Sequence, residues 1–127
     1  MNIRSLKKVF KLSSGFIRAQ ERNLVAVNNI NLDIDEGETL GLVGESGCGK
    51  STLAKIILRL EKPSAGNILF KGKDIISFDR VQLKAYRRNV QLIFQDPYSS
   101  LNPRKTAAGI IREPLTIHNV ADNKKRD

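Results

Sequence analysis

The chain has 127 residues, of which 40% are apolar and 28% are charged, so we expect a globular domain with a core rather than a disordered chain. The net charge of +9 permits acidic partners, but basic residues are spread along the chain and no nucleic-acid-binding motif accompanies them, so we expect no nucleic-acid partner. A single cysteine excludes an internal disulfide, and no apolar run approaches the roughly 20 residues that cross a bilayer. We therefore expect any membrane association to be peripheral.

The first third of the chain contains two strand patterns. Residues 6–10 form a short strand candidate, and residues 13–23 form a polar connection that contains glycine. Ile30, Leu32 and Ile34 then alternate with polar residues, which is typical of a half-buried strand. These patterns predict an N-terminal β structure.

A strand, a glycine-rich loop and a helix are predicted to follow. Residues 39–43 (TLGLV) are short and almost wholly apolar, as in a strand that is covered on both faces of a parallel sheet. Residues 44–52 (GESGCGKST) form the loop. A helix should then begin near Lys50, because apolar residues recur at helical spacing in Leu53, Ile56, Ile57 and Leu60.

Three further elements are predicted before residue 95. Residues 67–71 alternate like a strand and lead into a turn at residues 71–74. Residues 79–88 predict a short basic helix, and residues 90–94 (VQLIF) predict a second buried strand.

The last part of the chain predicts one helix and a polar tail. Thr106 is a suitable N-cap for a helix over residues 107–112, which should end near Pro114. Residues 121–127 (ADNKKRD) are polar, and we expect them to be frayed.

Residues 44–51 match the phosphate-binding pattern G-x-x-x-x-G-K-[S/T], for which a chance match is on the order of 0.5% at ordinary residue usage. Gly44, Gly47 and Gly49 should allow positive φ angles, so that successive backbone N–H groups converge on phosphate oxygens. The positive end of the following helix dipole should add to this attraction. The pattern therefore predicts a nucleotide site.

Each side chain of the loop has an expected role. Lys50 should reach the β- and γ-phosphates, the Ser51 hydroxyl should ligate Mg²⁺, and Thr52 should bond to the phosphates from the other side. The predicted nucleotide-binding loop residues are Gly44, Glu45, Ser46, Gly47, Cys48, Gly49, Lys50, Ser51 and Thr52.

Two motifs in the right order resemble one family. Residues 36–52 (EGETLGLVGESGCGKST) resemble the Walker A region of ABC ATPases, and residues 94–104 (FQDPYSSLNPR) resemble their Q-loop. Residues 94–104 are also similar to the corresponding motif in the ATP-binding subunits of oligopeptide and dipeptide importers. The same holds for residues 110–118 (IIREPLTIH). The resemblance implies an incomplete α/β P-loop NTPase core with an N-terminal antiparallel β subdomain. It assigns residues 1–120 to a partial nucleotide-binding domain and residues 121–127 to a tail.

The resemblance also assigns roles outside the loop. Phe10 aligns with the aromatic residue that stacks on adenine, with Val9 as the neighbouring alternative. Gln95 matches the Q-loop glutamine, which contacts Mg²⁺ or the attacking water, so Lys50 and Gln95 are the catalytic candidates and Ser51 and Gln95 the metal candidates. Residues 98–104 would border the membrane subunit, and the lone His118 receives no role.

The function implied by the resemblance is that of an ATP-binding subunit of an ABC importer, which couples ATP binding and hydrolysis to the uptake of peptides or similar small solutes. Its cofactors would be ATP and Mg²⁺. Its partners would be transmembrane permease subunits, a second ATPase subunit in a homo- or heterodimer and, indirectly, an extracytoplasmic solute-binding protein. The subunit would lie peripherally on the cytoplasmic face of the cell membrane.

The sequence departs from the family pattern in lacking LSGGQ and the Walker B strand with its terminal Asp-Glu. We therefore expect either a truncated reading frame or a partial sequence, with little hydrolysis, an exposed apolar flank beside the P-loop strand and a tendency to aggregate. A truncated, non-catalytic nucleotide-binding remnant or interaction module is the alternative. Another P-loop class, such as a kinase or a DNA-handling ABC relative, would leave the 94–104 motif unexplained.

Overall fold

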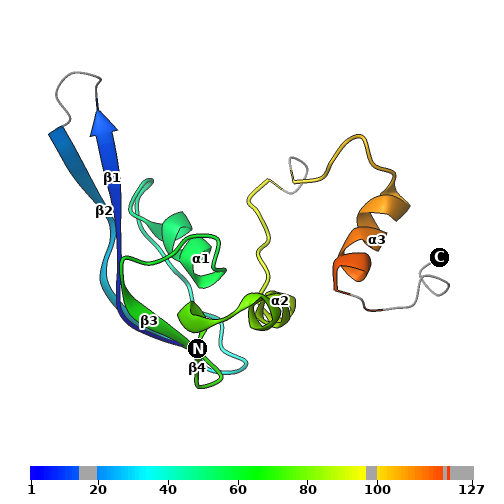
Figure 1. Cartoon of the computed structure of the whole chain (residues 1–127), viewed down its shortest axis with the longest axis horizontal. Coiled ribbons are helices and arrows are strands. Elements are labelled where there is room, and N and C mark those ends of the chain that lie inside the picture. The colour runs from blue at the N-terminus through cyan, green and yellow to red at the C-terminus, as the bar shows by residue number, and fades with distance from the viewer. Residues whose placement is uncertain (15–19, 97–99, 119, 121–127) are drawn as a thin grey trace. The chain divides into compact units, whose positions relative to one another are not determined.

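The computed structural model describes residues 1–14, 20–96, 100–118 and 120 (Figure 1). The chain divides into two compact units, Met1–Leu83 and Lys84–Asp127, which are described separately. The elements in chain order are β1 (Asn2–Ser14), β2 (Gln20–Asp33), α1 (Lys50–Ile57), β3 (Ala65–Phe70), β4 (Lys73–Asp74), the short 3₁₀ helix η1 (Ile75–Ser77), α2 (Arg80–Asn89) and α3 (Ala107–Ile117).

The first unit contains an antiparallel sheet with the strand order β2-β1-β3-β4. The predicted strands near residues 6–10, 30–34 and 67–71 are confirmed, but the first two are parts of longer strands. β1 and β2 pair along their whole length, from Asn2 opposite Asp33 to Ser14 opposite Gln20. The connection predicted over residues 13–23 is therefore shorter than expected, because both of its ends belong to the hairpin.

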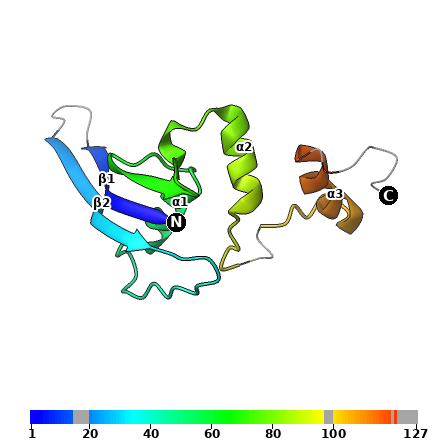
Figure 2. The same ribbon diagram turned by 90° about the horizontal axis from the view of Figure 1, so that it is seen from below.

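A bulge in β1 requires a glycine on its neighbour β3. The pairing of β1 with β2 and β3 shifts between Ile3 and Lys8, and Ser5 in this stretch has a φ of 46°. Gly66 of β3 lies against the bulge, where a Cβ atom would stand 2.4 Å from the Ser5 carbonyl oxygen. Bulges bend a strand and increase its twist, and Figures 1 and 2 show β1 and β2 curving together.

The predicted turn after β3 is confirmed as a tight hairpin. Phe70 pairs with Lys73, so that Lys71 and Gly72 form a two-residue turn with φ angles of 51° and 77°. Two positive φ angles are typical of the type I′ turn, whose twist matches that of the strands.

The helix predicted from Lys50 is confirmed as α1, which buries Leu53 and Ile56. The predicted apolar stripe is wrong at Leu60, which is 56% exposed, because α1 ends at Ile57 and Leu60 lies beyond its last turn. Leu58, just after the helix, is buried instead. The other buried apolar residues of this unit come from the sheet and η1: Ile3, Leu6, Val27, Ile68 and Ile75.

The two predicted buried strands are wrong. Neither residues 39–43 nor residues 90–94 are in a strand, and Val43 and Ile93 are 95% and 91% exposed. A strand needs a neighbour to accept and donate its backbone hydrogen bonds, and no other described segment pairs with either one. Leu40, Leu42 and Val43 of this segment are exposed, but the P-loop strand that the expected apolar flank would border does not form.

The helix predicted over residues 79–88 is confirmed as α2, which spans the boundary between the units and is seen side-on in Figure 2. Asp79 and Gln82 form a reciprocal capping pair at its start: the Gln82 N–H donates to Asp79 Oδ1 at 2.8 Å, and the Asp79 N–H donates to Gln82 Oε1 at 3.0 Å. Tyr86 is its buried residue.

The helix predicted after Thr106 is confirmed as α3, and the Thr106 hydroxyl accepts the Gly109 N–H at 3.2 Å. The predicted end near Pro114 is wrong, because α3 continues to Ile117. Proline lacks an N–H but retains its carbonyl, and the His118 N–H donates to the Pro114 oxygen at 3.0 Å. The predicted tail at residues 121–127 lies outside the described residues.

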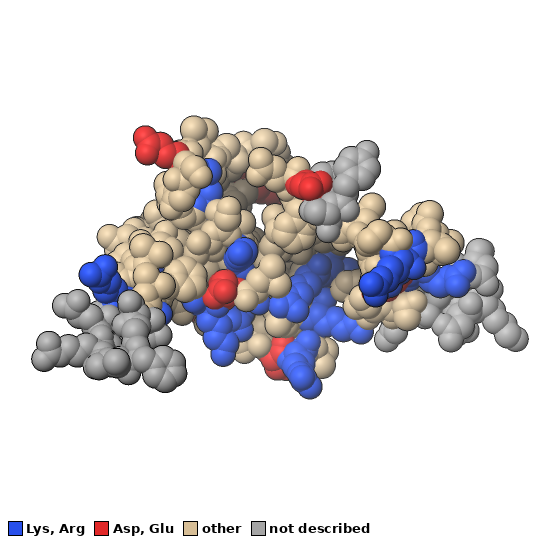
Figure 3. Space-filling model, turned by 90° about the horizontal axis from the view of Figure 1, so that it is seen from above, with Lys and Arg blue, Asp and Glu red and all other residues tan. Residues whose placement is uncertain are grey.

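The surface is basic, in accord with the net charge. On the face in Figure 3, Lys and Arg side chains predominate over Asp and Glu. On α2, the four basic residues are all exposed: Arg80, Lys84, Arg87 and Arg88. Among the described residues, no helix is both long enough and apolar enough to cross a membrane.

Candidate functional site

The loop at residues 44–52 is curled rather than extended. The Cys48 N–H donates to the Glu45 carbonyl oxygen at 3.3 Å, and Gly47 and Gly49 have φ angles of 82° and 100°. The prediction of positive φ is wrong for Gly44. A glycine at position 44 instead avoids a steric clash, because a Cβ atom there would stand 2.7 Å from Cys48 Sγ.

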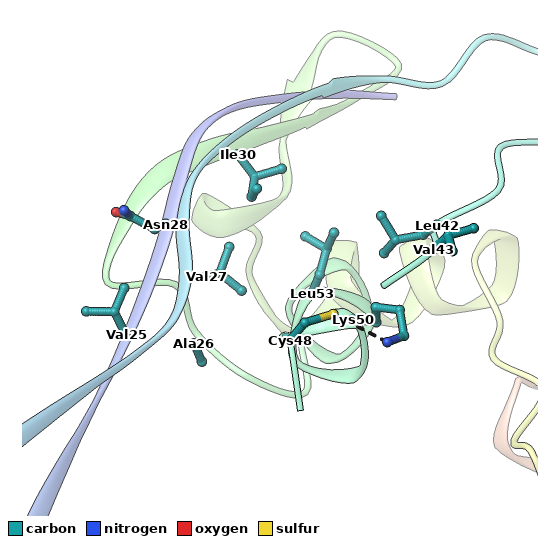
Figure 4. Close-up of a pocket in the computed structure, with 11 residues that line it drawn as sticks. Val25, Ala26, Val27, Asn28, Ile30, Leu42, Val43, Cys48, Lys50 and Leu53 are labelled. Carbon is teal, nitrogen blue, oxygen red and sulfur yellow. Dashed lines mark hydrogen bonds between the residues drawn. The ribbon is translucent and has the colours of Figure 1, made fainter. Parts of the chain in front are cut away.

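The ammonium group of Lys50 lies inside the curve of this loop. Lys50 Nζ donates to the carbonyl oxygens of Gly44 and Glu45, each at 2.6 Å, and to Cys48 Sγ at 3.3 Å. Figure 4 shows Lys50 and Cys48 side by side at the start of α1, with the contact between them dashed. The curled backbone and the cation therefore form one compact group.

The N-terminus of α1 adds backbone donors to the same place. Gly49 is the N-cap and supplies no side-chain acceptor, and the Leu53 N–H is the donor that reaches the Gly49 carbonyl, at 2.9 Å. The N–H groups of the first turn lack partners within the helix, and the helix dipole gives this end a partial positive charge. Ser51 is exposed here and Thr52 is half-buried. This arrangement suits a phosphate group.

A hollow of about 400 Å³ lies beside the loop. Its lining comes from β2, the segment before the loop, the loop and α1: Val25, Ala26, Val27, Asn28, Ile30, Leu42, Val43, Cys48, Gly49, Lys50 and Leu53. In Figure 4, Val27 and Ile30 lie on the α1 side of β2, and Asn28 points to the other side. Sequence reasoning missed the β2 residues, because only the folded hairpin brings residues 25–30 beside a loop that lies 20 positions later.

Phe10 lies on β1 and is not among the residues that line this hollow. It pairs with Leu24 of β2, is half-buried, and has Lys8 Nζ over its ring at 4.7 Å from the ring centroid. The alternative residue, Val9, pairs with Val25, which does line the hollow. The base-stacking role of Phe10 stays a prediction.

Gln95 is exposed and belongs to the second unit. It follows a segment that is not a strand, so the premise that it ends a buried strand is wrong, and its role stays a prediction.

Residues 97–99, which include Tyr98, lie outside the described residues. His118 caps the C-terminus of α3.

The described residues contain no group of three His, Cys, Asp or Glu side chains that could hold a metal ion. A Mg²⁺ ion that accompanies a nucleotide does not need such a group, because it usually keeps several waters and binds phosphate oxygens with one or two protein ligands. The exposed Ser51 hydroxyl, next to Lys50, is suited to be a single protein ligand of such an ion.

Residues 27–126 match the ABC transporter family. The oligopeptide transport ATP-binding protein AppF of Bacillus subtilis is 45% identical over 128 residues, which cover 100% of this chain and 39% of AppF. OppF of Lactococcus lactis, another oligopeptide transport ATP-binding protein, is 49% identical over 116 residues, 91% of this chain and 36% of OppF. The nickel import ATP-binding protein NikE of Shigella flexneri is 46% identical over 101 residues, which cover 80% of this chain and 38% of NikE.

The fold resembles that of a bacterial ABC transporter cassette solved as a dimer, with a TM-score of 0.79 and 29% identity. The same cassette in a post-hydrolysis state, bound to ADP and Pi, matches equally well. In both cases 98% of this chain matches 51% of the solved chain. This chain therefore spans less than half the length of the curated relatives above and about half of the solved cassette.

Proposed function

Because the chain belongs to the ABC transporter family, we propose that it is part of an ATP-binding subunit that couples ATP binding and hydrolysis to the import of peptides or similar small solutes. The relatives named for oligopeptide transport support peptides as the solute class, and the relative named for nickel import keeps other small solutes open. We assign residues 1–120 to one partial nucleotide-binding domain and residues 121–127 to its tail.

The observation that carries the proposal is the position of the Lys50 ammonium, which is held by two loop carbonyls at 2.6 Å in front of the N-terminus of α1. A triphosphate would offer this ammonium oxygen acceptors with more negative charge than the carbonyls, so it would compete for the same donor. The N–H groups of the loop and of the first helical turn would bind the remaining phosphate oxygens. Glu45, Ser46, Cys48 and Thr52 complete the proposed phosphate-binding loop.

We propose that Ser51 supplies the protein oxygen for Mg²⁺. When bound, the ion would neutralise charge that develops on the phosphates during transfer. Gln95 is the proposed second ligand and the residue that orients water. Because Gln95 is an amide, it would position the water by hydrogen bonding rather than remove its proton.

The proposed partners are a second ATPase subunit and transmembrane permease subunits. The dimeric state of the solved cassette supports the first, and the transport names of the relatives support the second. A subunit of this kind would lie peripherally on the cytoplasmic face of the cell membrane and would meet the solute-binding protein only indirectly.

The proposal is tested by measuring MgATP binding to the protein and to Lys50→Ala. The matched control is Lys55→Ala, which removes an exposed lysine from the last turn of the same helix. We expect Lys50→Ala to weaken binding by at least about 100-fold, since it removes hydrogen bonds between a charged donor and charged acceptors. Lys55→Ala should bind like the unchanged protein. Equal binding by the unchanged protein and a folded Lys50→Ala variant would refute the site.

A further inference from the structure

The Lys8 ammonium group has two oxygen partners that lie outside β1. The side chain is only 13% exposed, and Nζ forms an ion pair with Glu61 Oε2 at 3.0 Å. The same nitrogen donates to the Lys62 carbonyl oxygen at 2.8 Å. Glu61 and Lys62 follow α1, so this one ammonium joins β1 to the segment after the helix.

The same ammonium also lies over an aromatic ring. Lys8 Nζ stands 4.7 Å from the centroid of Phe10, within the distance at which a cation is attracted to a ring face. Lys8 and Phe10 are two residues apart on β1, so their side chains leave the strand on the same side. Two anchors outside β1 therefore fix the cation, and the cation in turn restricts the ring.

We propose that Lys8, anchored by Glu61 and the Lys62 carbonyl, is the positioning residue that holds the Phe10 ring as a platform for the base of the bound nucleotide. This inference rests on the proposed function. The ammonium occupies one face of the ring, so a planar base would stack on the other face. An ordered ring loses less conformational entropy when a base stacks on it than a ring that turns freely, so the anchor raises affinity for the base.

The simpler reading is that Lys8 only ties β1 to the segment after α1. The two roles differ in which part of the nucleotide binds more weakly when Lys8 is replaced. A purely structural tie would change the affinity for ATP and for tripolyphosphate, which has no base, in equal proportion. A platform anchor affects ATP alone, because the phosphates are bound by the loop at residues 44–52.

The experiment compares binding of MgATP and magnesium tripolyphosphate to the protein and to Lys8→Met, which keeps most of the length of the side chain and removes its charge. We expect Lys8→Met to weaken MgATP binding roughly three- to tenfold, as the size of cation–π contacts indicates. Tripolyphosphate binding should change by less than about twofold. Glu61→Gln should act in the same direction with a smaller effect, since the Lys62 carbonyl still holds the ammonium.

Three further variants make the result specific. Lys8→Arg, which keeps a cation over the ring, should retain the affinity ratio of ATP to tripolyphosphate, and so should Lys7→Met, which removes an exposed neighbouring lysine. Lys8→Met should have little further effect in a Phe10→Ala background, since both changes remove the same platform. Unchanged ATP binding by Lys8→Met, or an equal loss for both ligands, overturns the inference. If the unchanged protein binds neither MgATP nor magnesium tripolyphosphate, the proposed function itself is overturned.

Discussion

Gly49 lies so close to Ala26 that a Cβ atom on Gly49 would stand 2.2 Å from the Ala26 carbonyl oxygen. The φ of Gly49, 100°, is also one that L side chains rarely adopt. Gly49 is the last residue before α1, and Ala26 is in the middle of β2. The strand therefore fixes where the helix begins, and with it the loop that holds Lys50.

Gly49→Ala should displace the start of α1 from β2. We expect a loss of at least about 2 kcal/mol in the free energy of unfolding, because a backbone clash adds to the cost of the positive φ. MgATP binding should be lost as well, since the donors of the loop and the first helical turn would no longer converge. Denaturant unfolding and equilibrium binding measure the two effects.

The matched control is Gly72→Ala in the β3–β4 turn. Gly72 has a similar φ of 77°, but a Cβ atom there would meet nothing within 4 Å. It should lose about 1 kcal/mol from the positive φ alone and should keep MgATP binding. Equal losses of stability in the two variants would show that the close approach of Gly49 to Ala26 does not contribute to the free energy of unfolding.

Alkylation of Cys48 should block nucleotide binding. Cys48 is exposed and is the one cysteine in the chain, so a maleimide reagent modifies a single site. Its sulfur lies 3.3 Å from Lys50 Nζ, so an added group would occupy the space inside the loop. We expect complete loss of MgATP binding on modification, and slower modification when MgATP is present.

Cys48→Ser serves as the control for alkylation. It should bind MgATP about as well as the unchanged protein and should keep that binding after treatment with the reagent. Modification that proceeds at the same rate with and without saturating MgATP would contradict the placement of Cys48 beside the phosphates.

The loop and α1 were predictable because their determinants are local. Residues 44–52 carry their own glycines and lysine, and the apolar spacing of Leu53 and Ile56 marks the buried side of the helix within one turn. The Thr106 cap and the Lys71-Gly72 turn were predictable for the same reason, since each depends on residues within four positions. These local features were enough to predict the starts of α1 and α3 and the turn after β3.

The features that the sequence did not reveal depend on distant partners. Residues 39–43 and 90–94 have the composition of buried strands, but composition does not supply the neighbouring strand that a sheet requires. The contact between Gly49 and Ala26 and the ion pair between Lys8 and Glu61 join positions that are far apart in the sequence. The end of α3 was missed because a proline can lie within a helix whose later carbonyls still find donors.

Replacing exposed apolar residues in the unpaired segments should reduce self-association. Val43 and Ile93 are 95% and 91% exposed, and each lies in a segment with the composition of a strand, which can pair with another copy of the chain. We expect the double variant Val43→Thr, Ile93→Thr to scatter markedly less light at a given protein concentration. Val81→Thr on α2 removes a comparable exposed side chain, 77% exposed, from a helix whose backbone is already bonded. Equal improvement by Val81→Thr would mean that general surface hydrophobicity, rather than unpaired strand-like backbone, causes the association.

Tyr86 should make the protein sensitive to alkaline pH. Burial raises the pKa of the Tyr86 phenol to about 12, against about 10 in an unfolded chain. Between these two values the unfolded state releases the phenolic proton while the folded state retains it, so the free energy of unfolding falls as the pH rises from about 10 to about 12. Below about 10 both states are neutral, and this group contributes no pH dependence.

The measurement is denaturant unfolding across that pH range for the protein and for Tyr86→Phe. The phenylalanine variant should lose less stability over this pH range than the unchanged protein, because it has no buried phenol to ionise. Unfolding at neutral pH provides the reference that separates this pH effect from any direct effect of removing the hydroxyl. Parallel losses in the two proteins would show that the Tyr86 hydroxyl ionises as readily in the folded chain as in the unfolded one.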